Sequence, residues 1–320
     1  MVDRIKIMLP DYSPNENLNW VKVKNKNFPD KTFYRALLFN RRFDKRRHPL
    51  WLLLTANEKT EKFSLSISGS IRKWYFNKNS RSDLKYEEFN DSLNLLANDI
   101  GINLETLLNG KVTKIELGLT ILLKAKMRRL IDCLIKYRNA EREIFKETTL
   151  YFKFGNYKLV FYDKYLEMNK CTKWTKKEEI VFNKFYFLRF EINANKVSGT
   201  NLKTDYNTPK KIIENWNSIP SLIENYISDI VFVDVISSKK RNEIRSYSNL
   251  KNYLLHLGIK KLVEENNISL LTSVIKNRSD TKKILKAYHV NLADEYCLRA
   301  NFLFELNKKL KRLIYNKSNI

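Results

Sequence analysis

Apolar and polar residues alternate in several runs before residue 200, and a two-residue period is typical of β-strands with one buried face. The pattern predicts strands at 32–39, 50–56, 63–71, 112–123, 150–154, 158–163 and 185–193. Gly155 and Asn156 form a turn signal between two of these runs, so we expect a hairpin there.

A helical period of about 3.6 residues interrupts the strands twice. The segment 83–100 follows Ser82, a good N-cap, and gathers its apolar residues on one face; the segment 124–137 shows a similar apolar face. After Pro209 the pattern becomes helical, and it predicts helices at 210–216, 221–232, 248–257, 268–275, 281–288 and 292–314.

This order of elements predicts an α+β fold, in which an antiparallel sheet is covered by helices and is followed by a mainly helical C-terminal region. A chain of 320 residues with 43% hydrophobic composition can bury a large core. We place a first domain at 1–205 and a second at 206–320.

Two predicted strands each carry a glutamate on their polar side. Ile115, Leu117 and Leu119 point one way in the first strand, which sends Glu116 to the other face. In the same way Glu191 lies opposite Phe190 and its apolar neighbours. Two such carboxylates could converge on one divalent cation, because hard cations prefer oxygen ligands. A solvated strand face would show the same alternation.

Tyr162 ends a predicted strand and is followed at once by charged residues, namely Asp163, Lys164 and Glu167. A lysine beside a tyrosine can stabilise a phenolate or the charge that develops on phosphorus, so Tyr162 is a candidate nucleophile. The alternatives are that Tyr162 packs like most of the 17 tyrosines, and that Asp163 and Lys164 form a surface pair.

The chain carries 60 Lys plus Arg against 35 Asp plus Glu, a net charge of +25. Such an excess favours an anionic partner, and nucleic acid fits better than a membrane surface because the charge runs through the whole chain. An AT-rich genome alone does not keep acidic residues so far below lysine. Two segments interleave basic and aromatic residues, so that the cations could contact phosphates and the aromatic rings could stack on unpaired bases; a solvated loop and core aromatics are the alternatives. The candidate DNA-contacting residues are Arg41, Arg42, Lys45, Arg46, Arg47, Arg72 and Lys73.

Other features of the composition exclude several classes of protein. The apolar run 50–56 is too short to span a bilayer, and we expect a cytoplasmic protein with no membrane partner. The three cysteines are widely spaced and predict reduced packing residues, not a metal motif. The three histidines lie far apart, and we give none a catalytic role.

Several short blocks, in this order along the chain, resemble the replication initiators of filamentous phages, the gene II and gene X endonucleases, and are similar to rolling-circle initiators of small plasmids. The blocks are Phe-Ser-Leu-Ser-Ile-Ser-Gly-Ser at 63–70, the helix from Asp83, Val-Thr-Lys-Ile-Glu-Leu at 112–117, Leu-Val-Phe-Tyr-Asp-Lys at 159–164 and Leu-Arg-Phe-Glu at 188–191. The resemblance implies a nicking-endonuclease type of fold.

The resemblance also implies a reaction. Tyr162 would attack one strand of the replication origin, form a 5′-phosphotyrosine link and free a 3′-hydroxyl for the host polymerase. Lys164 would neutralise charge beside it, and Mg²⁺ or Mn²⁺ would be held by Glu116, Glu191 and, as a weaker third ligand, Glu167. The implied partners are origin DNA, duplex and single-stranded, with the host helicase and polymerase, and a homodimer is compatible with this role. The His-hydrophobic-His metal motif of the wider nicking superfamily is missing here, so an all-carboxylate site is implied.

Other functions remain open. A noncatalytic origin-binding or transcription-regulating protein would have the same charge, with Tyr162 only packing. A carboxylate-metal nuclease that uses water would cut without a covalent link. A tyrosine recombinase is disfavoured because histidine is nearly absent.

Overall fold

The computed structural model describes residues 1–24, 31–57, 60–78, 82–169, 176–232 and 298–314, with short pieces between 246 and 280. The chain divides into two compact units. The first comprises Met1–Ile131, Ile135–Val231 and Glu305–Ile320, and the second comprises Asp132–Leu134 and Phe232–Phe304. Most of the second unit lies outside the described residues, so the account below concerns the first. The boundary predicted after residue 205 stays a prediction.

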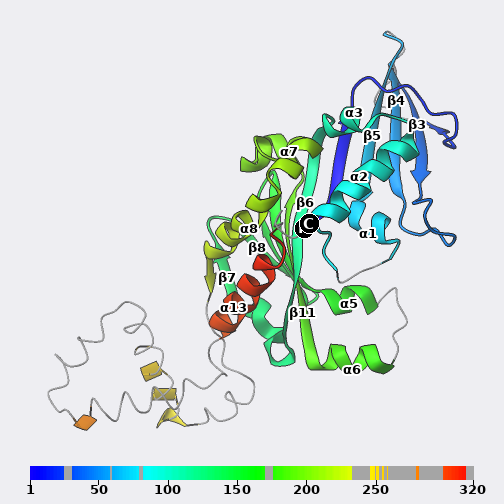
Figure 1. Ribbon diagram of the computed structural model, residues 1–320. Coiled ribbons are helices and arrows are strands. Elements are labelled where there is room, and N and C mark those ends of the chain that lie inside the picture. The colour runs from blue at the N-terminus through cyan, green and yellow to red at the C-terminus, as the bar shows by residue number, and fades with distance from the viewer. Residues whose placement is uncertain are drawn as a thin grey trace. The chain divides into compact units, whose positions relative to one another are not determined.

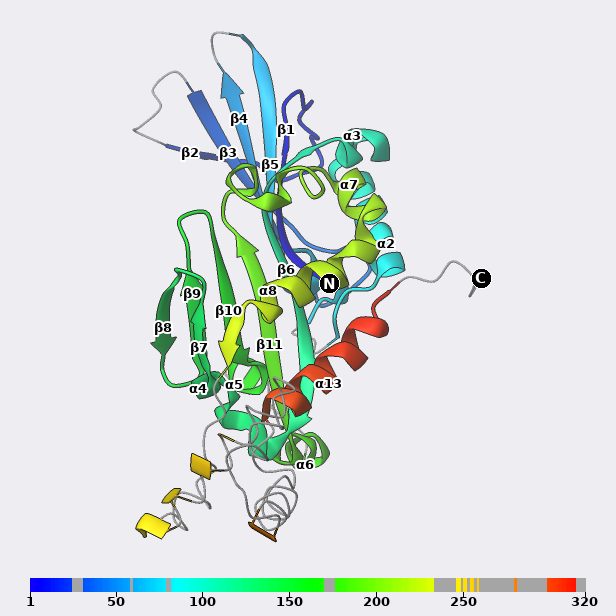
Figure 2. The ribbon, with the colours of Figure 1, turned by 90° about the vertical axis from the view of Figure 1, so that its left-hand side faces the viewer.

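A ten-stranded sheet, whose neighbouring strands are antiparallel, forms the centre of the first unit (Figures 1 and 2). Its strand order is β2-β3-β4-β5-β1-β6-β11-β10-β9-β8. The strands are β1 (Val2–Leu9), β2 (Val21–Val23), β3 (Lys31–Leu38), β4 (Leu50–Asn57), β5 (Lys62–Ser70), β6 (Lys111–Lys124), β8 (Glu141–Phe145), β9 (Thr149–Lys153), β10 (Tyr157–Asp163) and β11 (Phe185–Ala194).

The fold prediction is confirmed at the level of an α+β chain with a large antiparallel sheet and several helices. Each strand predicted from the alternation is present, with its ends shifted by one residue at most, and the hairpin of β9 and β10 turns at Gly155 and Asn156 as expected. Within this sheet, the strands that were not predicted from the sequence are β1, β2 and β8. In β1 the charged residues Asp3, Arg4 and Lys6 obscure the apolar alternation.

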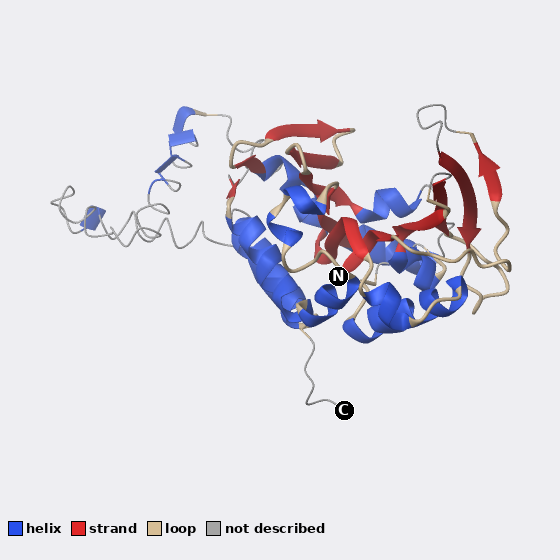
Figure 3. Cartoon of the chain, turned by 90° about the horizontal axis from the view of Figure 1, so that it is seen from above, coloured by secondary structure: helices blue, strands red, loops and turns tan. Residues whose placement is uncertain are grey.

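Most helices gather on one side of the sheet: Figure 2 shows this for α2, α3 and α7, and the view from above in Figure 3 shows most of the helices (blue) on one side of the strands (red). Helix α2 is the predicted amphipathic helix and begins three residues later than expected, so Asp83 stays outside it. The helices are α1 (Ile71–Phe76), α2 (Tyr86–Ile100), α3 (Leu104–Leu108), α4 (Leu130–Cys133), α5 (Lys164–Asn169), α6 (Lys176–Lys184), α7 (Pro209–Glu214), α8 (Ile219–Ser228) and α13 (Leu298–Lys311). Short 3-10 turns are η1 (Ala125–Arg129), η2 (Val197–Gly199), η3 (Asn201–Lys203) and η4 (Trp216–Ser218).

The prediction of a helix at 124–137 is wrong. The segment forms η1 and the short helix α4 and then the strand β7 (Leu134–Tyr137). The helix predicted at 221–232 likewise ends early, because its last residues form β12 (Ile230–Phe232), which pairs with β7 in a second, two-stranded sheet. In both segments strand pairing overrides the local apolar periodicity.

Other predictions lie partly beyond the described residues. The helices predicted at 248–257, 268–275 and 281–288 fall there, as do Cys171 and Cys297, whereas Cys133 is a buried thiol. Among the described helices, none combines the length and the apolar character needed to cross a membrane.

The two faces of the central strands differ in chemistry. On one face lie buried apolar side chains, among them Leu117 and Leu119 of β6 and Phe190 of β11. The same alternation turns polar and charged side chains to the other face. That second face carries the candidate site.

Candidate active site

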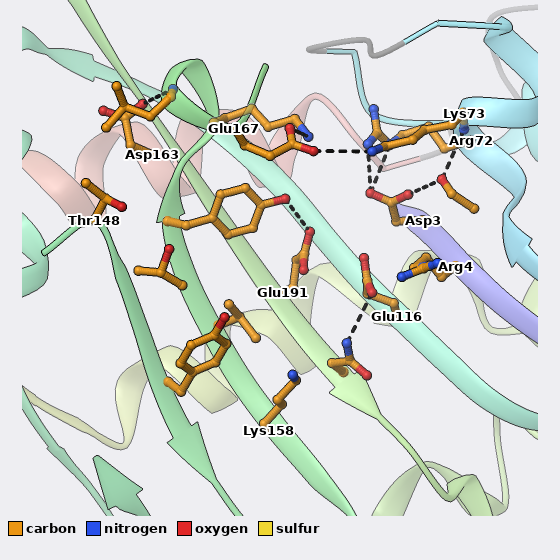
Figure 4. Close-up of a pocket in the computed structure, with 18 of the residues that line it drawn as sticks. Asp3, Arg4, Arg72, Lys73, Glu116, Thr148, Lys158, Asp163, Glu167 and Glu191 are labelled. Carbon is orange, nitrogen blue, oxygen red and sulfur yellow. Dashed lines mark hydrogen bonds and ion pairs between the residues drawn. The ribbon is translucent and has the colours of Figure 1, made fainter. Parts of the chain in front are cut away.

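A cleft of about 620 Å³ opens on the polar face of the sheet. Strands β1, β6, β11 and β10 form its floor, and residues of α1 and α5 line its rim (Figure 4). Its lining includes most of the residues expected to carry the chemistry, namely Glu116, Glu191, Tyr162, Lys164, Glu167, Arg72 and Lys73. The three-dimensional fold therefore brings together candidates that lie far apart in the sequence.

Asp3 joins this group through an irregularity in β1. Val2 pairs with Leu117 and Arg4 pairs with Glu116, so Asp3 is an extra residue with no partner of its own across the ladder. Such a bulge redirects side chains, and Asp3 turns toward Glu116 instead of joining the apolar face. Asp3, Glu116 and Glu191 are all buried, and each offers a carboxylate oxygen within 4.8 Å of the others.

The two predicted glutamates are therefore not on a solvated strand face. Glu116 and Glu191 are each only 6% exposed. They come from adjacent strands, where Glu191 pairs with Gly118 and Glu116 with Asn193, whose side-chain amide donates to Glu116 Oε2 at 3.2 Å. The two carboxylates therefore lie close together, and their role as ligands of one divalent cation stays a prediction.

Glu116 is the least compensated carboxylate of the three. In the described part of the chain, no lysine or arginine lies within ion-pair distance of it. Burial raises its pKa well above the usual value, and the nearby charges of Glu191 and Asp3 raise it further. In the folded protein Glu116 is therefore either protonated or, when ionised, stabilised by a bound cation.

Arg189 links the remaining acids. Its guanidinium is buried and donates to three carboxylates: Nε to Glu191 Oε1 at 3.0 Å, Nη2 to Asp3 Oδ2 at 2.8 Å, and Nη1 to Asp83 Oδ1. Asp83, just before α2, also forms an ion pair with Lys309 of α13 at 2.7 Å. This role of Arg189 was not predicted from the sequence.

Arg72 and Ser70 fix the position of Asp3. The buried Arg72 donates to Asp3 Oδ2 through Nε and Nη2, at 3.0 and 2.8 Å, and Ser70 Oγ donates to Oδ1 at 2.6 Å. Burial alone would raise the pKa of Asp3, but Arg72 and Arg189 outweigh it and hold that pKa well below its usual range. Arg72 was proposed to contact DNA, and it lies inside the cleft beside a carboxylate (Figure 4).

Tyr162 is joined directly to the carboxylate group. It pairs with Arg189 in the sheet, and its hydroxyl donates to Glu191 Oε1 at 2.9 Å. Burial raises the pKa of Tyr162, and the charge of Glu191 raises it further, so the phenol is protonated in the free protein. Lys164 Nζ stands 5.7 Å from the centre of the Tyr162 ring.

Lys164, Glu167 and Lys73 form a second charged group at the rim. Glu167 accepts from Lys164 Nζ at 2.7 Å and from Lys73 Nζ at 3.2 Å. Burial lowers the pKa of Lys164; burial would raise the pKa of Glu167, but the two ammonium groups lower it overall. Glu167, expected as a weaker third metal ligand, is thus held between two lysines, and Asp3 takes the place beside Glu116 and Glu191.

The basic loop between β3 and β4 divides into two parts. Arg41 and Arg42 form ion pairs with Asp99 and Asp91 of α2, at 3.5 and 3.0 Å. The side chains of Lys45, Arg46 and Arg47 are exposed. Those three keep their charge available to a partner in solution, while the first two are partly neutralised.

No protein-family model matches this chain, and neither a curated protein nor a solved structure matches it. Its chemistry is therefore inferred from the side chains of the cleft. They offer a phenol, a group of close carboxylates and several cations within one hollow.

Gly118 leaves space for this arrangement. A Cβ at this position would lie 2.6 Å from the Phe190 carbonyl oxygen, 2.9 Å from Glu191 Cγ and 3.0 Å from Arg189 Nη2. We expect Gly118→Ala to lower the free energy of unfolding by about 1–3 kcal/mol, because backbone or buried side chains must shift. Urea denaturation measures this loss. Gly155→Ala is the matched control, since a Cβ there meets nothing within 4 Å. Equal stability of the two variants would show that Gly118 is not needed for packing.

The raised pKa of Glu116 predicts a pH dependence of stability. The folded state binds this proton more tightly than the unfolded chain, whose glutamate has the ordinary pKa of 4.5. Stability without divalent ions must therefore fall as the pH rises above that value. We expect Glu116→Gln, which removes the titration, to be more stable than the wild type at about pH 8 and to match it near pH 4.

Thermal unfolding in EDTA across this pH range tests the expectation. Added Mn²⁺ should raise the Tm of the wild type more than that of Glu116→Gln, since a bound ion stabilises only the folded state. If the Tm of the wild type and of Glu116→Gln changed in parallel with pH, and Mn²⁺ raised both equally, the account of Glu116 would be contradicted.

Proposed function

We propose that this protein is a metal-dependent DNA nicking-closing endonuclease that initiates rolling-circle replication through a tyrosine. The observation that carries the proposal is the 2.9 Å hydrogen bond from the Tyr162 hydroxyl to Glu191, itself one of three adjoining buried carboxylates. The ordered blocks that resemble phage and plasmid initiators support the same reaction. On that resemblance we assign the sheet and its helices to the nicking-endonuclease type.

The proposed reaction is a reversible transesterification. Glu191 Oε1 accepts the Tyr162 proton, and the phenolate oxygen attacks the scissile phosphate in line. A phosphotyrosine bond forms, the bond to the 3′ oxygen breaks, and that oxygen takes a proton to become a 3′-hydroxyl. The link conserves the energy of the phosphodiester, so a later 3′-hydroxyl can reverse the step and close the strand. No nucleotide is consumed.

The carboxylates fit a hard divalent cation, Mg²⁺ or Mn²⁺. Oxygen ligands suit both ions, and Glu116 lacks the cationic partners that Asp3 and Glu191 have. Glu116 and Glu191 would hold the ion with Asp3 beside them. When bound, the ion would polarise phosphate oxygens and stabilise charge on the leaving oxygen.

Lysines at the rim of the cleft would neutralise the negative charge of the phosphate. Lys164 is buried next to the Tyr162 ring, and Lys73 shares Glu167 with it. When phosphate enters, these ammonium groups can turn from Glu167 toward its oxygens and stabilise the transition state. The chain's net charge of +25 would attract the DNA as a whole. Origin DNA, duplex and single-stranded, is the proposed partner, with the host helicase and polymerase acting on the nicked product, and a homodimer is compatible with this role.

A hydrolytic nuclease is the second candidate, and the raised pKa of Tyr162 favours it. In that mechanism the phenol stays protonated and only orients Glu191, while a water attacks the phosphate. The two reactions differ in their products: one leaves protein on the DNA and the other does not.

The test uses single-stranded DNA segments that tile the replicon encoding this chain. Each segment carries one label at its 5′ end and another at its 3′ end, and is incubated with the protein in Mg²⁺, in Mn²⁺ or in EDTA. The proposal predicts that the 3′ label migrates with the protein on a denaturing gel, while the 5′ label is freed on a fragment that a polymerase extends. Cutting without a protein-linked label would favour the hydrolytic nuclease. Tight binding without cutting in Mg²⁺ or Mn²⁺ would favour a noncatalytic DNA-binding protein.

A further inference from the structure

Among the residues that the structure describes, none covers one face of the half of the sheet formed by β3, β4, β5 and β1, where Trp51, Leu37 and Met8 are exposed. Residues directly opposite each other in antiparallel strands share a face, and the register Leu37, Trp51, Ser68, Lys6, Lys114 crosses β3, β4, β5, β1 and β6 in one row. The helices α2, α3 and α7 lie on the other side of these strands, as Figure 2 shows. Side chains of this row therefore point away from those helices.

Trp51 is the most unusual residue of the row. It is 50% exposed, although tryptophan is largely buried in most proteins. Arg35, from the adjacent strand, lies over its ring at 5.9 Å from the centroid. Leu37 and Met8, on the same face, are 43% and 39% exposed. An indole surface at this position is free to stack on a flat ligand.

The charge of this half of the sheet is mostly positive. Arg4, Lys6, Arg35 and Lys114 lie on the same face as Trp51. The carboxylates of strands β1 to β6 are Asp3 and Glu116, and both are buried at the cleft. A second copy of this chain would bring these cations against one another. An anionic ligand with flat, stackable groups is complementary to both features, and single-stranded DNA has both.

The uncovered face is continuous with the active-site cleft. A second hollow of about 360 Å³ is lined by Trp51, Lys6 and Lys114 together with Arg4, Glu116 and Asn193, and these last three also line the cleft. Between β4 and β6 there are three strand spacings of about 4.8 Å, or roughly 14 Å. A strand of DNA whose phosphate is bound at Glu116 can therefore reach Trp51 within a few nucleotides.

We propose that this surface, the Trp51 face (Arg4, Lys6, Arg35, Trp51 and Lys114), binds the single-stranded DNA that flanks the scissile phosphate, with one base stacked on Trp51. The proposal rests on the proposed function, because it extends the substrate of that cleft. The lysines and arginines contact the phosphates, and the tryptophan holds a base without selecting its identity. The Trp51 face would thus determine how tightly the strand is held, while the cleft cuts it.

The test measures binding separately from cutting. Full-length protein in EDTA is titrated into a fluorescein-labelled oligothymidine of about 20 nucleotides, and anisotropy gives the Kd. We expect Trp51→Leu, which keeps an apolar strand residue but loses the aromatic surface, to weaken binding about tenfold. Trp51→Phe should retain most of the affinity. Lys6→Ala with Lys114→Ala should weaken binding and reduce its dependence on salt.

The outcomes separate this inference from the proposed function. Trp51→Leu with wild-type affinity and an unchanged salt dependence in the lysine variant would overturn the Trp51 face, even if the protein nicks DNA. Weaker binding in Trp51→Leu, restored in Trp51→Phe, supports the face even if no nicking is found. Circular dichroism and thermal unfolding of each variant check that the sheet is intact; if Trp51→Leu fails to fold, the salt dependence of the lysine variant decides the question.

Discussion

Arg189→Met should cost about 3–5 kcal/mol of unfolding free energy, the largest stability loss that we expect from any single substitution in the cleft. The guanidinium is buried and forms ion pairs with Asp3, Asp83 and Glu191 at the same time. Removing it leaves buried carboxylates without their main counter-charge, whereas methionine fills a similar volume. Urea denaturation at neutral pH measures the loss.

Arg41→Met is the matched control for this prediction. Its ion pair with Asp99 is at the surface, with the arginine side chain 53% exposed, so we expect a change within about 1 kcal/mol. If Arg189→Met were as stable as Arg41→Met, the carboxylates would not depend on the guanidinium, and the account of the cleft's charge balance would be wrong.

Tyr162→Phe should lower the rate of DNA nicking by about three orders of magnitude or more, because it removes the attacking oxygen and leaves the ring in place. Affinity for single-stranded DNA should stay close to that of the wild type, since the phenol is one contact among many. Single-turnover cleavage in Mn²⁺, measured next to anisotropy binding, separates the two effects.

Tyr151→Phe provides the control, because Tyr151 lines the same cleft from β9. It should cut at a rate near that of the wild type. Unimpaired nicking by Tyr162→Phe would exclude Tyr162 as the nucleophile and favour attack by water. Equal losses of nicking rate in Tyr162→Phe and Tyr151→Phe would indicate that both hydroxyls only support the structure of the site.

Much of the sheet could be predicted from the sequence because its strands have one apolar and one polar face. That alternation also placed Glu116 and Glu191 on a common side, and their convergence needed only that β6 and β11 be neighbours. The position of Tyr162 at the end of β10 was predicted in the same way. Local periodicity is informative where burial differs strictly between the two faces.

Asp3 could not be found by this reasoning. Regular alternation puts it with Ile5 and Ile7 on the apolar face, and only the bulge at its position turns it to the carboxylates. The structural roles of Arg189 and Arg72 could not be predicted for another reason. In a basic chain, a basic residue is readily interpreted as a DNA contact unless its acidic partners are known. Their shared partner Asp3 lies 69 residues before Arg72 and 186 residues before Arg189, so no local sequence pattern connects them.

The central claim is that the oxygen of Tyr162 becomes bonded to DNA, and peptide mapping of the adduct tests this most directly. Wild-type protein is reacted with origin single-stranded DNA and Mn²⁺, the DNA is digested to a short stub, and the protein is cleaved with trypsin for mass spectrometry. The account predicts a nucleotide-bearing peptide whose modified residue is Tyr162. A stub on another tyrosine such as Tyr165, or cut DNA with no modified peptide, would contradict it.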